Sequence, residues 1–193
     1  MDGEGHPVGT EEFRCAPGPA GWRYVAQITT AEPEPHDEVV DLVADAGWRP
    51  IRSRIETSSH RLLLEAEPER LRGDLDGAPL SLAWGPERHL DYLSPAYNAV
   101  TARRLDGTTE IDVVFLEPVT CVPRDERQLY ELRGGEEVAT PVGRFSATRW
   151  RYTALSTGWS RDLWVAGDVV VRYEGLFELD AYEAGASGPR PSG

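Results

Sequence analysis

The stretch Gly143-Arg-Phe-Ser-Ala-Thr-Arg-Trp-Arg-Tyr-Thr153, followed by Ser160-Arg-Asp-Leu-Trp-Val-Ala-Gly-Asp-Val-Val-Val-Arg-Tyr-Glu-Gly-Leu-Phe177, carries the clearest fold signal in the chain. Aromatic and β-branched side chains alternate along it with arginine, and a Gly-Asp step interrupts it. Alternation with a period of two is typical of β-strands, and a Gly-Asp step favours a tight turn. The stretch therefore predicts three curved antiparallel strands, the last two joined by a hairpin at 166–168.

Turn signals divide the rest of the chain into short segments of the same kind. Runs of β-branched, aromatic and leucine residues lie between Pro, Gly and Asp-Gly steps, which is typical of a mainly β chain. The Asp106-Gly107 pair tolerates positive φ in a tight turn, so it predicts a second hairpin that joins 101–105 to 110–116. The expected strands are residues 22–29, 49–56, 60–67, 110–116, 145–153, 161–166 and 169–177.

The length of 193 residues suits one domain with a single core. We expect this domain to span 13–183, because residues 1–12 and 184–193 contain few apolar side chains and should be disordered. The chain shows no basic and apolar leader and no run long enough to cross a membrane, so it is expected to be soluble and cytoplasmic. Cys15 and Cys121 lie far apart in the sequence, and a disulfide is not predicted.

Residues 37–46 carry two competing patterns. Val39, Leu42, Val43 and Ala46 follow helical spacing, with Asp37 as N-cap, and this local evidence favours a helix. The same segment also alternates, which is compatible with a strand.

Charge and composition exclude several classes of function. The net charge of −13 disfavours nucleic acid as a partner, since binding a polyanion needs a cationic surface. All 20 basic residues are arginine, so lysine Schiff-base chemistry is excluded. The spacings typical of Ser-His-Asp, Cys-His, phosphate-loop and zinc sites are absent, and no metal or cofactor is predicted.

Aromatic and arginine side chains take opposite faces of the strand expected at 145–153. Trp150 and Tyr152 share one face, whereas Arg149 and Arg151 share the other with Phe145, because successive side chains alternate. Any single aromatic residue is explained well enough as core packing. As a set, the aromatic residues favour the lining of a cavity in a curled sheet.

The segment 88–105 concentrates polar residues in a Pro-interrupted connection. His89 and Asp91, two positions apart, form the most credible proton-transfer pair in the sequence. In the plainer interpretation, Asp91 and Asn98 satisfy the backbone of an irregular segment. Arg103 and Arg104, together with Arg161 further along, are candidates to bind a phosphate or carboxylate group.

Several scattered motifs extend this segment along the chain. They are Asp45-Ala-Gly-Trp48-Arg, Asp91, Ser94-Pro95, Asn98, Arg104-Leu105, Pro118, Gln128-x-Tyr130 and Tyr173-Glu174-Gly175-Leu176-Phe177. Together they resemble the glycolipid-binding protein family of bacteria over residues 22–180. The chain departs from the family at Ala96-Tyr-Asn-Ala-Val-Thr, where the family has Thr-Asn-Thr-Leu-Pro, and at Glu174, where it has Pro. These departures put the contacts of the first segment and the turn at the second in doubt.

The resemblance implies a single curled antiparallel sheet, a spiral β-roll or half-barrel similar to bacterial lipoprotein carriers, with a concave apolar cavity. It also implies a strand at 37–46, and we adopt this reading over the local helical pattern because tertiary pairing overrides weak propensity.

Two functions fit these observations, with a third interpretation beside them. The first is a binding protein for an amphipathic or hydrophobic, glycolipid-like molecule. The second is a cyclase or isomerase type of enzyme, with His89, Asp91, Tyr92 or Tyr130 moving a proton. The third is an interaction module that forms a homodimer through a sheet edge. The candidate ligand-binding residues are Trp84, Asp91, Tyr97, Asn98, Arg103, Arg104, Gln128, Tyr130, Trp150, Tyr152, Arg161, Trp164 and Tyr173.

Overall fold

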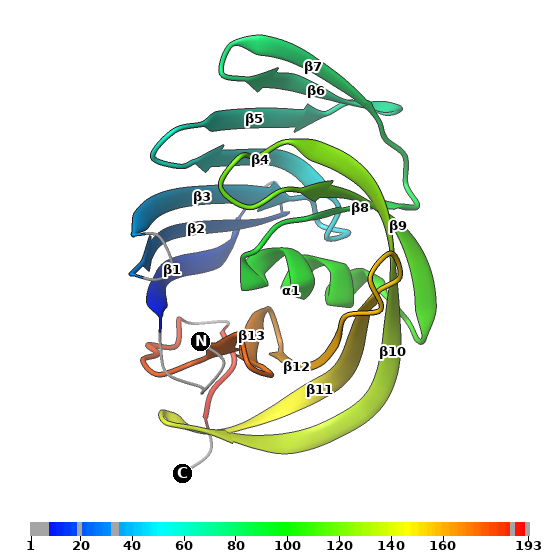
Figure 1. The fold of residues 1–193 in the computed structure, drawn as a ribbon. Helices are drawn as coiled ribbons and strands as arrows, with labels where there is room; N and C mark the ends of the chain where they lie inside the picture. The colour runs from blue at the N-terminus through cyan, green and yellow to red at the C-terminus, as the bar shows by residue number, and fades with distance from the viewer. Residues whose placement is uncertain (1–7, 19–20, 32–34, 186–187, 192–193) are drawn as a thin grey trace.

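Two seven-stranded sheets face each other in the computed structural model, which describes residues 8–18, 21–31, 35–185 and 188–191 (Figure 1). The first sheet is an antiparallel meander in chain order. Its strands are β1 (Gly9–Gly18), β2 (Gly21–Thr30), β3 (His36–Ala44), β4 (Pro50–Glu56), β5 (Arg61–Ala66), β6 (Arg70–Leu75) and β7 (Ala78–Ala83).

The second sheet runs in the order β14-β13-β12-β11-β10-β9-β8. Its strands are β8 (Arg88–Asp91), β9 (Thr109–Leu116), β10 (Pro123–Thr140), β11 (Gly143–Ala154), β12 (Ser160–Ala166), β13 (Val169–Tyr173) and β14 (Phe177–Glu178). β8 and β9 pair in parallel, and a parallel pair needs a crossover connection. Helix α1 (Pro95–Arg104) provides this connection. The other neighbours pair antiparallel, and the whole chain forms the curled, mainly β single domain expected from the sequence.

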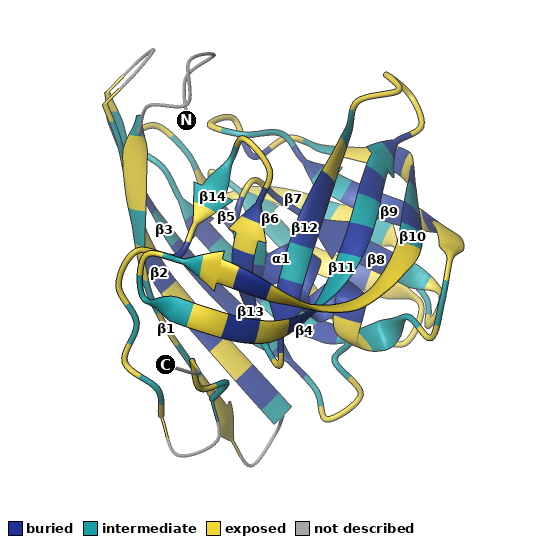
Figure 2. Ribbon diagram, turned by 90° about the horizontal axis from the view of Figure 1, so that it is seen from below, coloured by how far each residue is buried: buried dark blue, intermediate teal, exposed yellow. Residues whose placement is uncertain are grey.

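Helix α1 occupies the space between the two curled sheets (Figures 1 and 2). Tyr97 and Val100 belong to an apolar cluster that includes Leu42 and Leu64 of the first sheet. Ala99 and Ala102 belong to a second cluster that lies on the second sheet. The concave face expected to hold a cavity is therefore largely filled by this helix.

The hairpin predicted for 101–105 and 110–116 is wrong, because residues 101–104 form the last turn of α1. Ser94 caps the helix by accepting a hydrogen bond from the Ala96 backbone N–H, and Pro95 follows at the first helical position. Every residue from Ala96 to Ala102 is buried. A helix that is buried on all sides has no polar face, so the periodic signal of an amphipathic helix is missing.

Residues 36–44 form strand β3, so the local helical pattern is wrong and the strand implied by the family resemblance is confirmed. Val40, Leu42 and Ala44 are buried on one face in the first apolar cluster. On the opposite face, Asp41 receives hydrogen bonds from Arg23 of β2 and Arg52 of β4. Pairing with β2 on one side and β4 on the other therefore sets the conformation of residues 36–44.

Most other predicted strands are confirmed, including the hairpin that joins β12 and β13. The strand predicted at 169–177 ends at Tyr173, because a turn with Gly175 at φ 71° separates it from β14. Residues 9–12, expected to be disordered, begin strand β1 and pair with 27–30. Residues 1–7, also expected to be disordered, lie outside the described residues. The described residues of the 184–193 tail have no regular secondary structure.

The two sheets contact each other on the side of the molecule away from β8. The indole N–H of Trp22 in β2 donates a 2.9 Å hydrogen bond to Asp168, in the turn between β12 and β13. Phe13 and Cys15 of β1 pack against a third apolar cluster that contains Phe145 and Val171. None of the described residues forms a helix long and apolar enough to cross a membrane.

Candidate functional site

A pocket of about 260 Å³ lies where the N-terminal end of α1 meets the second sheet. Its walls come from β8, β9, β10, β11 and β13, from α1 and from the segment that carries Leu176 and Phe177. The pocket is lined by Asp91, Tyr92, Leu93, Ser94, Asn98, Phe115, Arg124, Glu126, Tyr152, Ala154, Thr157, Trp159, Tyr173, Leu176 and Phe177.

Four aromatic rings form one continuous wall of this pocket. Tyr152 lies with its ring centroid 5.7 Å from Trp159 and 6.3 Å from Tyr173. Tyr173 in turn lies 6.2 Å from Trp159 and 6.4 Å from Phe177. These separations are typical of packed aromatic pairs, so the wall is an apolar surface of fixed shape.

A buried carboxyl group, that of Asp91, lies in this mostly apolar pocket. The Gln128 side-chain amide donates a 2.7 Å hydrogen bond to Asp91 Oδ2, and the Tyr92 backbone N–H supports the same carboxyl group. Burial raises the pKa of Asp91 to about 7, and the nearby negative charge of Glu126 acts in the same direction. Asp91 can therefore hold a proton near neutral pH and either donate or accept a hydrogen bond.

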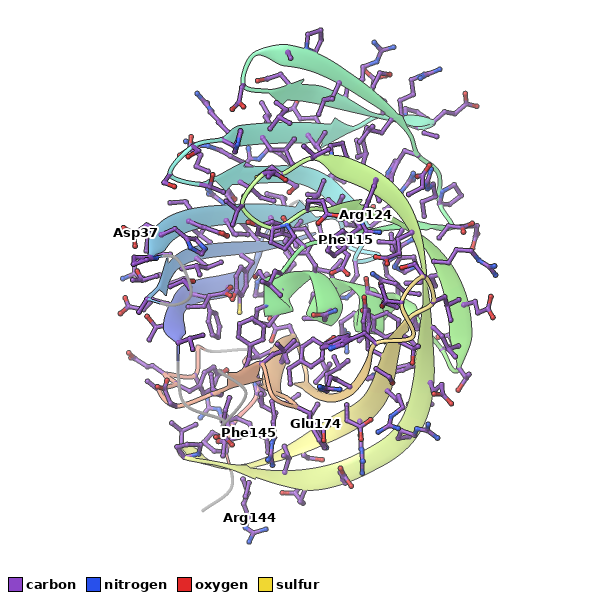
Figure 3. The ribbon with its side chains drawn as sticks, viewed as in Figure 1. Asp37, Phe115, Arg124, Arg144, Phe145 and Glu174 are labelled. Carbon is purple, nitrogen blue, oxygen red and sulfur yellow. The ribbon has the colours of Figure 1, made fainter. Side chains whose placement is uncertain are left out.

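The carboxylate of Glu126, also in the pocket wall, is stabilised by its neighbours. Its Oε1 accepts a 2.6 Å hydrogen bond from the Ser156 hydroxyl and lies 3.4 Å from Arg124 Nη1. The Arg124 guanidinium stacks over Phe115 at 4.5 Å, and Figure 3 shows both side chains beside the upper end of the second sheet. The pocket thus holds two carboxyl groups in different surroundings.

The mouth of the pocket exposes two large apolar side chains, Trp159 and Leu93, which are 37% and 50% accessible to solvent. The Arg161 guanidinium stacks over the Trp159 ring at 5.2 Å. No ion pair joins Arg161 to a carboxylate among the described residues, and its one hydrogen bond goes to the Ser160 carbonyl. An apolar rim with a free positive charge suits a molecule with a polar or anionic end.

The structure brings together about half of the residues predicted for the site. Asp91, Tyr92, Asn98, Tyr152 and Tyr173 line the pocket. Two others lie directly behind it: Gln128 holds Asp91, and Tyr130 accepts a 2.9 Å hydrogen bond from the Asn98 amide.

Other predicted residues lie elsewhere in the molecule. Tyr97 points toward the first sheet, where its hydroxyl lies 2.7 Å from Ser53 Oγ. Trp164 donates a hydrogen bond to Glu136 and stacks with Arg149 and Arg172, away from the pocket. Arg103 and Trp150 line a second, more polar hollow at the C-terminal end of α1. Trp84 and Arg104 lie near Arg49.

His89 does not pair with Asp91. Its Nδ1 lies 3.3 Å from the Thr101 hydroxyl, inside the molecule and outside the pocket lining. Burial and the positive charge of Arg104 lower the pKa of His89 to about 3, so its ring stays neutral. The two residues are two positions apart on β8, but their side chains have different partners.

Sequence reasoning did not select several residues of the pocket wall. Glu126 lies two positions before Gln128 and four before Tyr130 on β10, so alternation along this strand would have placed all three on one face. Phe115 and Arg124 gave no comparable signal. None of the described residues forms a group of three or more His, Cys, Asp and Glu side chains that could hold a metal ion.

The fold and the pocket define a β-barrel-like protein with a small apolar pocket. No family model and no curated protein matches the chain. Among solved structures it is similar to a DUF1089 family protein from Pseudomonas aeruginosa, with 20% identity, a TM-score of 0.66 and coverage of 90% of this chain and 93% of that one. A β-barrel-like DUF1849 protein from Brucella abortus gives 10% identity, a TM-score of 0.50 and coverage of 86% and 80%. At these identities the likeness shows the fold alone.

Proposed function

We propose that this protein binds one small amphipathic molecule in the pocket beside Asp91. The observation that carries the proposal is the combination of a continuous aromatic wall with the buried carboxyl group of Asp91, which accepts a hydrogen bond from Gln128. Ligand sites in proteins are concave and mostly apolar, and a few placed polar groups fix the ligand's orientation.

The size of the pocket limits what it can enclose. Its volume of about 260 Å³ is just below the roughly 300–1,000 Å³ typical of sites for drug-sized ligands. The apolar part of the ligand is therefore a single short chain or a small ring system. A glycolipid-like molecule, the class suggested by the family resemblance, would place one chain inside and its head group at the mouth.

The polar end of the ligand would lie at the mouth, near Arg161 and the exposed face of Trp159. Arg161 carries a positive charge without an ion pair among the described residues, so a carboxylate or phosphate on the ligand would gain a charge-assisted hydrogen bond. Deeper in the pocket, Asp91 would meet a hydroxyl or carbonyl group of the ligand. Such a protein would act in the cytoplasm as a carrier or receptor of its ligand.

A second function, acid-base catalysis, is favoured by one observation: the carboxyl group of Asp91 lies buried in the pocket wall, hydrogen-bonded to Gln128, and burial raises its pKa to about 7. A general acid or base works best when its pKa lies near the working pH. Tyr92 is less suited, since its hydroxyl already donates a 2.5 Å hydrogen bond to Glu38. His89 and Tyr130 do not line the pocket. In this alternative Asp91 moves the proton while the aromatic wall folds the substrate.

Titration of a fluorescent single-chain fatty acid tests the binding proposal. Ala154, a small buried residue of the wall, offers the variant Ala154→Phe, which fills the pocket. Ala139→Phe adds the same volume at an exposed position of β10 and serves as the matched control. Saturable binding that Ala154→Phe abolishes and Ala139→Phe retains supports the proposal. Equal binding by both variants overturns it.

A further inference from the structure

A group of arginines near the C-terminal end of α1 has no carboxylate ion-pair partner among the described residues. Many of the described arginines form ion pairs, such as Arg23 with Asp41 and Arg149 with Asp162. Arg49, Arg103 and Arg104 form none among the described residues, although acidic residues outnumber basic ones by 33 to 20 in the chain. Such an excess of acid makes an unpaired cluster of positive charge unexpected.

The turn between β3 and β4 and the helix hold these arginines together. Arg103 of α1 stacks on Trp48 of this turn at 4.9 Å. The next residue, Arg49, stacks on Trp84 at 5.8 Å. Its position is fixed because Asp45 accepts hydrogen bonds from the backbone N–H groups of Gly47 and Arg49. The Asp45 carboxylate is thereby used by the backbone and forms no ion pair with Arg49.

Arg104 is held in place by backbone carbonyls and has no carboxylate within ion-pair distance among the described residues. Its Nη1 donates to the Arg88 carbonyl at 3.0 Å and its Nη2 to the Pro86 carbonyl at 2.6 Å. Burial and the nearby positive charge of Arg49 both lower the pKa of Arg104, whereas Asp45 and Glu87 raise it only in part. The two guanidinium groups are therefore close enough to repel each other.

Buried donors without acceptors are concentrated at the same place. Nε and Nη2 of Arg49, Nε1 of Trp84 and Nε of Arg88 are shielded from solvent and have no hydrogen-bond partner. Trp84 is only 5% exposed, so its indole N–H cannot turn to bulk water. Each unsatisfied buried donor costs free energy, and several around two positive charges call for a shared acceptor.

We propose that Arg49, Arg104 and Trp84 form a binding site for an oxyanion, most simply a phosphate group, separate from the apolar pocket. Two guanidinium groups and an indole N–H offer donors to the several oxygens of such a group, and arginine forks match phosphate geometry. The same chemistry suits a free phosphate, a phosphorylated metabolite or the head group of a phospholipid. The site does not depend on the function proposed for the pocket.

Inorganic phosphate is the first probe, titrated by calorimetry at constant ionic strength set with sodium chloride. We expect saturable binding that Arg49→Gln weakens about tenfold or more, as the loss of a charge-assisted hydrogen bond predicts. Trp84→Phe, which keeps the ring and removes only the N–H donor, should weaken it less. Arg70→Gln, at an exposed arginine bound to Ser81, is the control and should leave binding unchanged. A soluble phosphate monoester and vesicles containing phosphatidic acid, titrated in parallel, distinguish the sources of the group.

Thermal unfolding without phosphate separates this role from a structural one. An arginine that serves binding does not stabilise the fold when no ligand is bound. The melting temperature of Arg49→Gln without phosphate should therefore be no lower than that of the wild-type protein. Phosphate should raise only the melting temperature of the wild-type protein. Absence of saturable binding of all three probes would overturn the proposal. Equal binding by the wild-type protein and Arg49→Gln would overturn it as well.

Discussion

The Gln128 side chain of β10 donates a 2.7 Å hydrogen bond to the carboxyl group of Asp91 at the end of β8. The two strands are not neighbours, because β9 lies between them in the sheet. The bond therefore spans β9 on the face that meets α1. It fixes the carboxyl group of Asp91 in the mostly apolar pocket, and Gln128 itself is buried.

Asp91 should make the protein less stable as pH rises. Its pKa is raised from 3.8 to about 7, so the folded state holds a proton that the unfolded chain has lost. The resulting stabilisation is complete below about pH 4 and is lost as pH rises through about 7. Asp91→Asn mimics the neutral acid and should be more stable than the wild-type protein at pH 8, on the order of 1–3 kcal/mol. Urea unfolding at pH 5 and pH 8 measures this.

Glu11 should act in the same direction at a separate place. Its carboxyl group accepts 2.7 Å hydrogen bonds from Tyr24 and Ser94, and burial raises its pKa from 4.5 to about 7. Glu11→Gln should therefore remove part of the pH dependence that remains in Asp91→Asn. If unfolding of the double variant is as sensitive to pH between 5 and 8 as that of the wild-type protein, the two carboxyl groups are ionised in the folded state and this account of them is wrong.

Tyr130 should be needed for stability and not for binding. Its hydroxyl accepts the hydrogen bond from the buried Asn98 amide, so Tyr130→Phe leaves a buried donor without its partner and should cost about 1–3 kcal/mol. Affinity for the fatty acid probe should stay within about twofold, as expected for a residue outside the pocket lining. A large loss of affinity with unchanged stability would place Tyr130 in the site after all.

Trp159 should show the opposite behaviour. It is 37% exposed at the mouth of the pocket and contacts Tyr152 and Tyr173, so Trp159→Ala should reduce affinity about tenfold while changing stability by less than about 1 kcal/mol. Leu155 is also 37% exposed but does not line the pocket, and Leu155→Ala is the matched control. Equal affinities of the two variants would argue against ligand contact at the mouth.

Asp168 should contribute to the closure of the two sheets. Asp168→Ala removes the acceptor of the buried Trp22 indole N–H and should cost about 1–3 kcal/mol, whereas Asp168→Asn keeps an acceptor and should cost less. Asp112→Ala, at an exposed aspartate of β9, provides the comparison. Chemical unfolding of the three variants gives the order of their stabilities. An equal loss of stability in Asp168→Ala and Asp112→Ala would contradict a role of Asp168 in closing the two sheets.

Local sequence patterns predicted seven of the fourteen described strands, because alternation and turn residues act over a few positions. β1, β6, β7, β8, β10 and β14 were not predicted as strands, and β3 was predicted only from the family resemblance. Local patterns failed at α1, which is buried on all sides and shows no polar stripe. They also failed at β3, whose conformation is set by pairing with β2 and β4 and by the hydrogen bonds of Asp41 with Arg23 and Arg52. The site shows the same division. Asp91, Asn98 and Tyr152 were identified from motif and alternation, whereas Phe115 and Arg124 take part through contacts that only the folded chain creates.

Native mass spectrometry of the protein as purified from its host, followed by organic extraction, shows whether the pocket beside Asp91 holds a ligand. We expect a bound amphiphile of defined mass on the wild-type protein and on Ala139→Phe, and none on Ala154→Phe, whose pocket is filled. Addition of a single-chain fatty acid should restore the bound form of any empty wild-type fraction. A wild-type protein that is empty as purified and stays empty with added amphiphile would contradict the claim that the pocket beside Asp91 is a binding site.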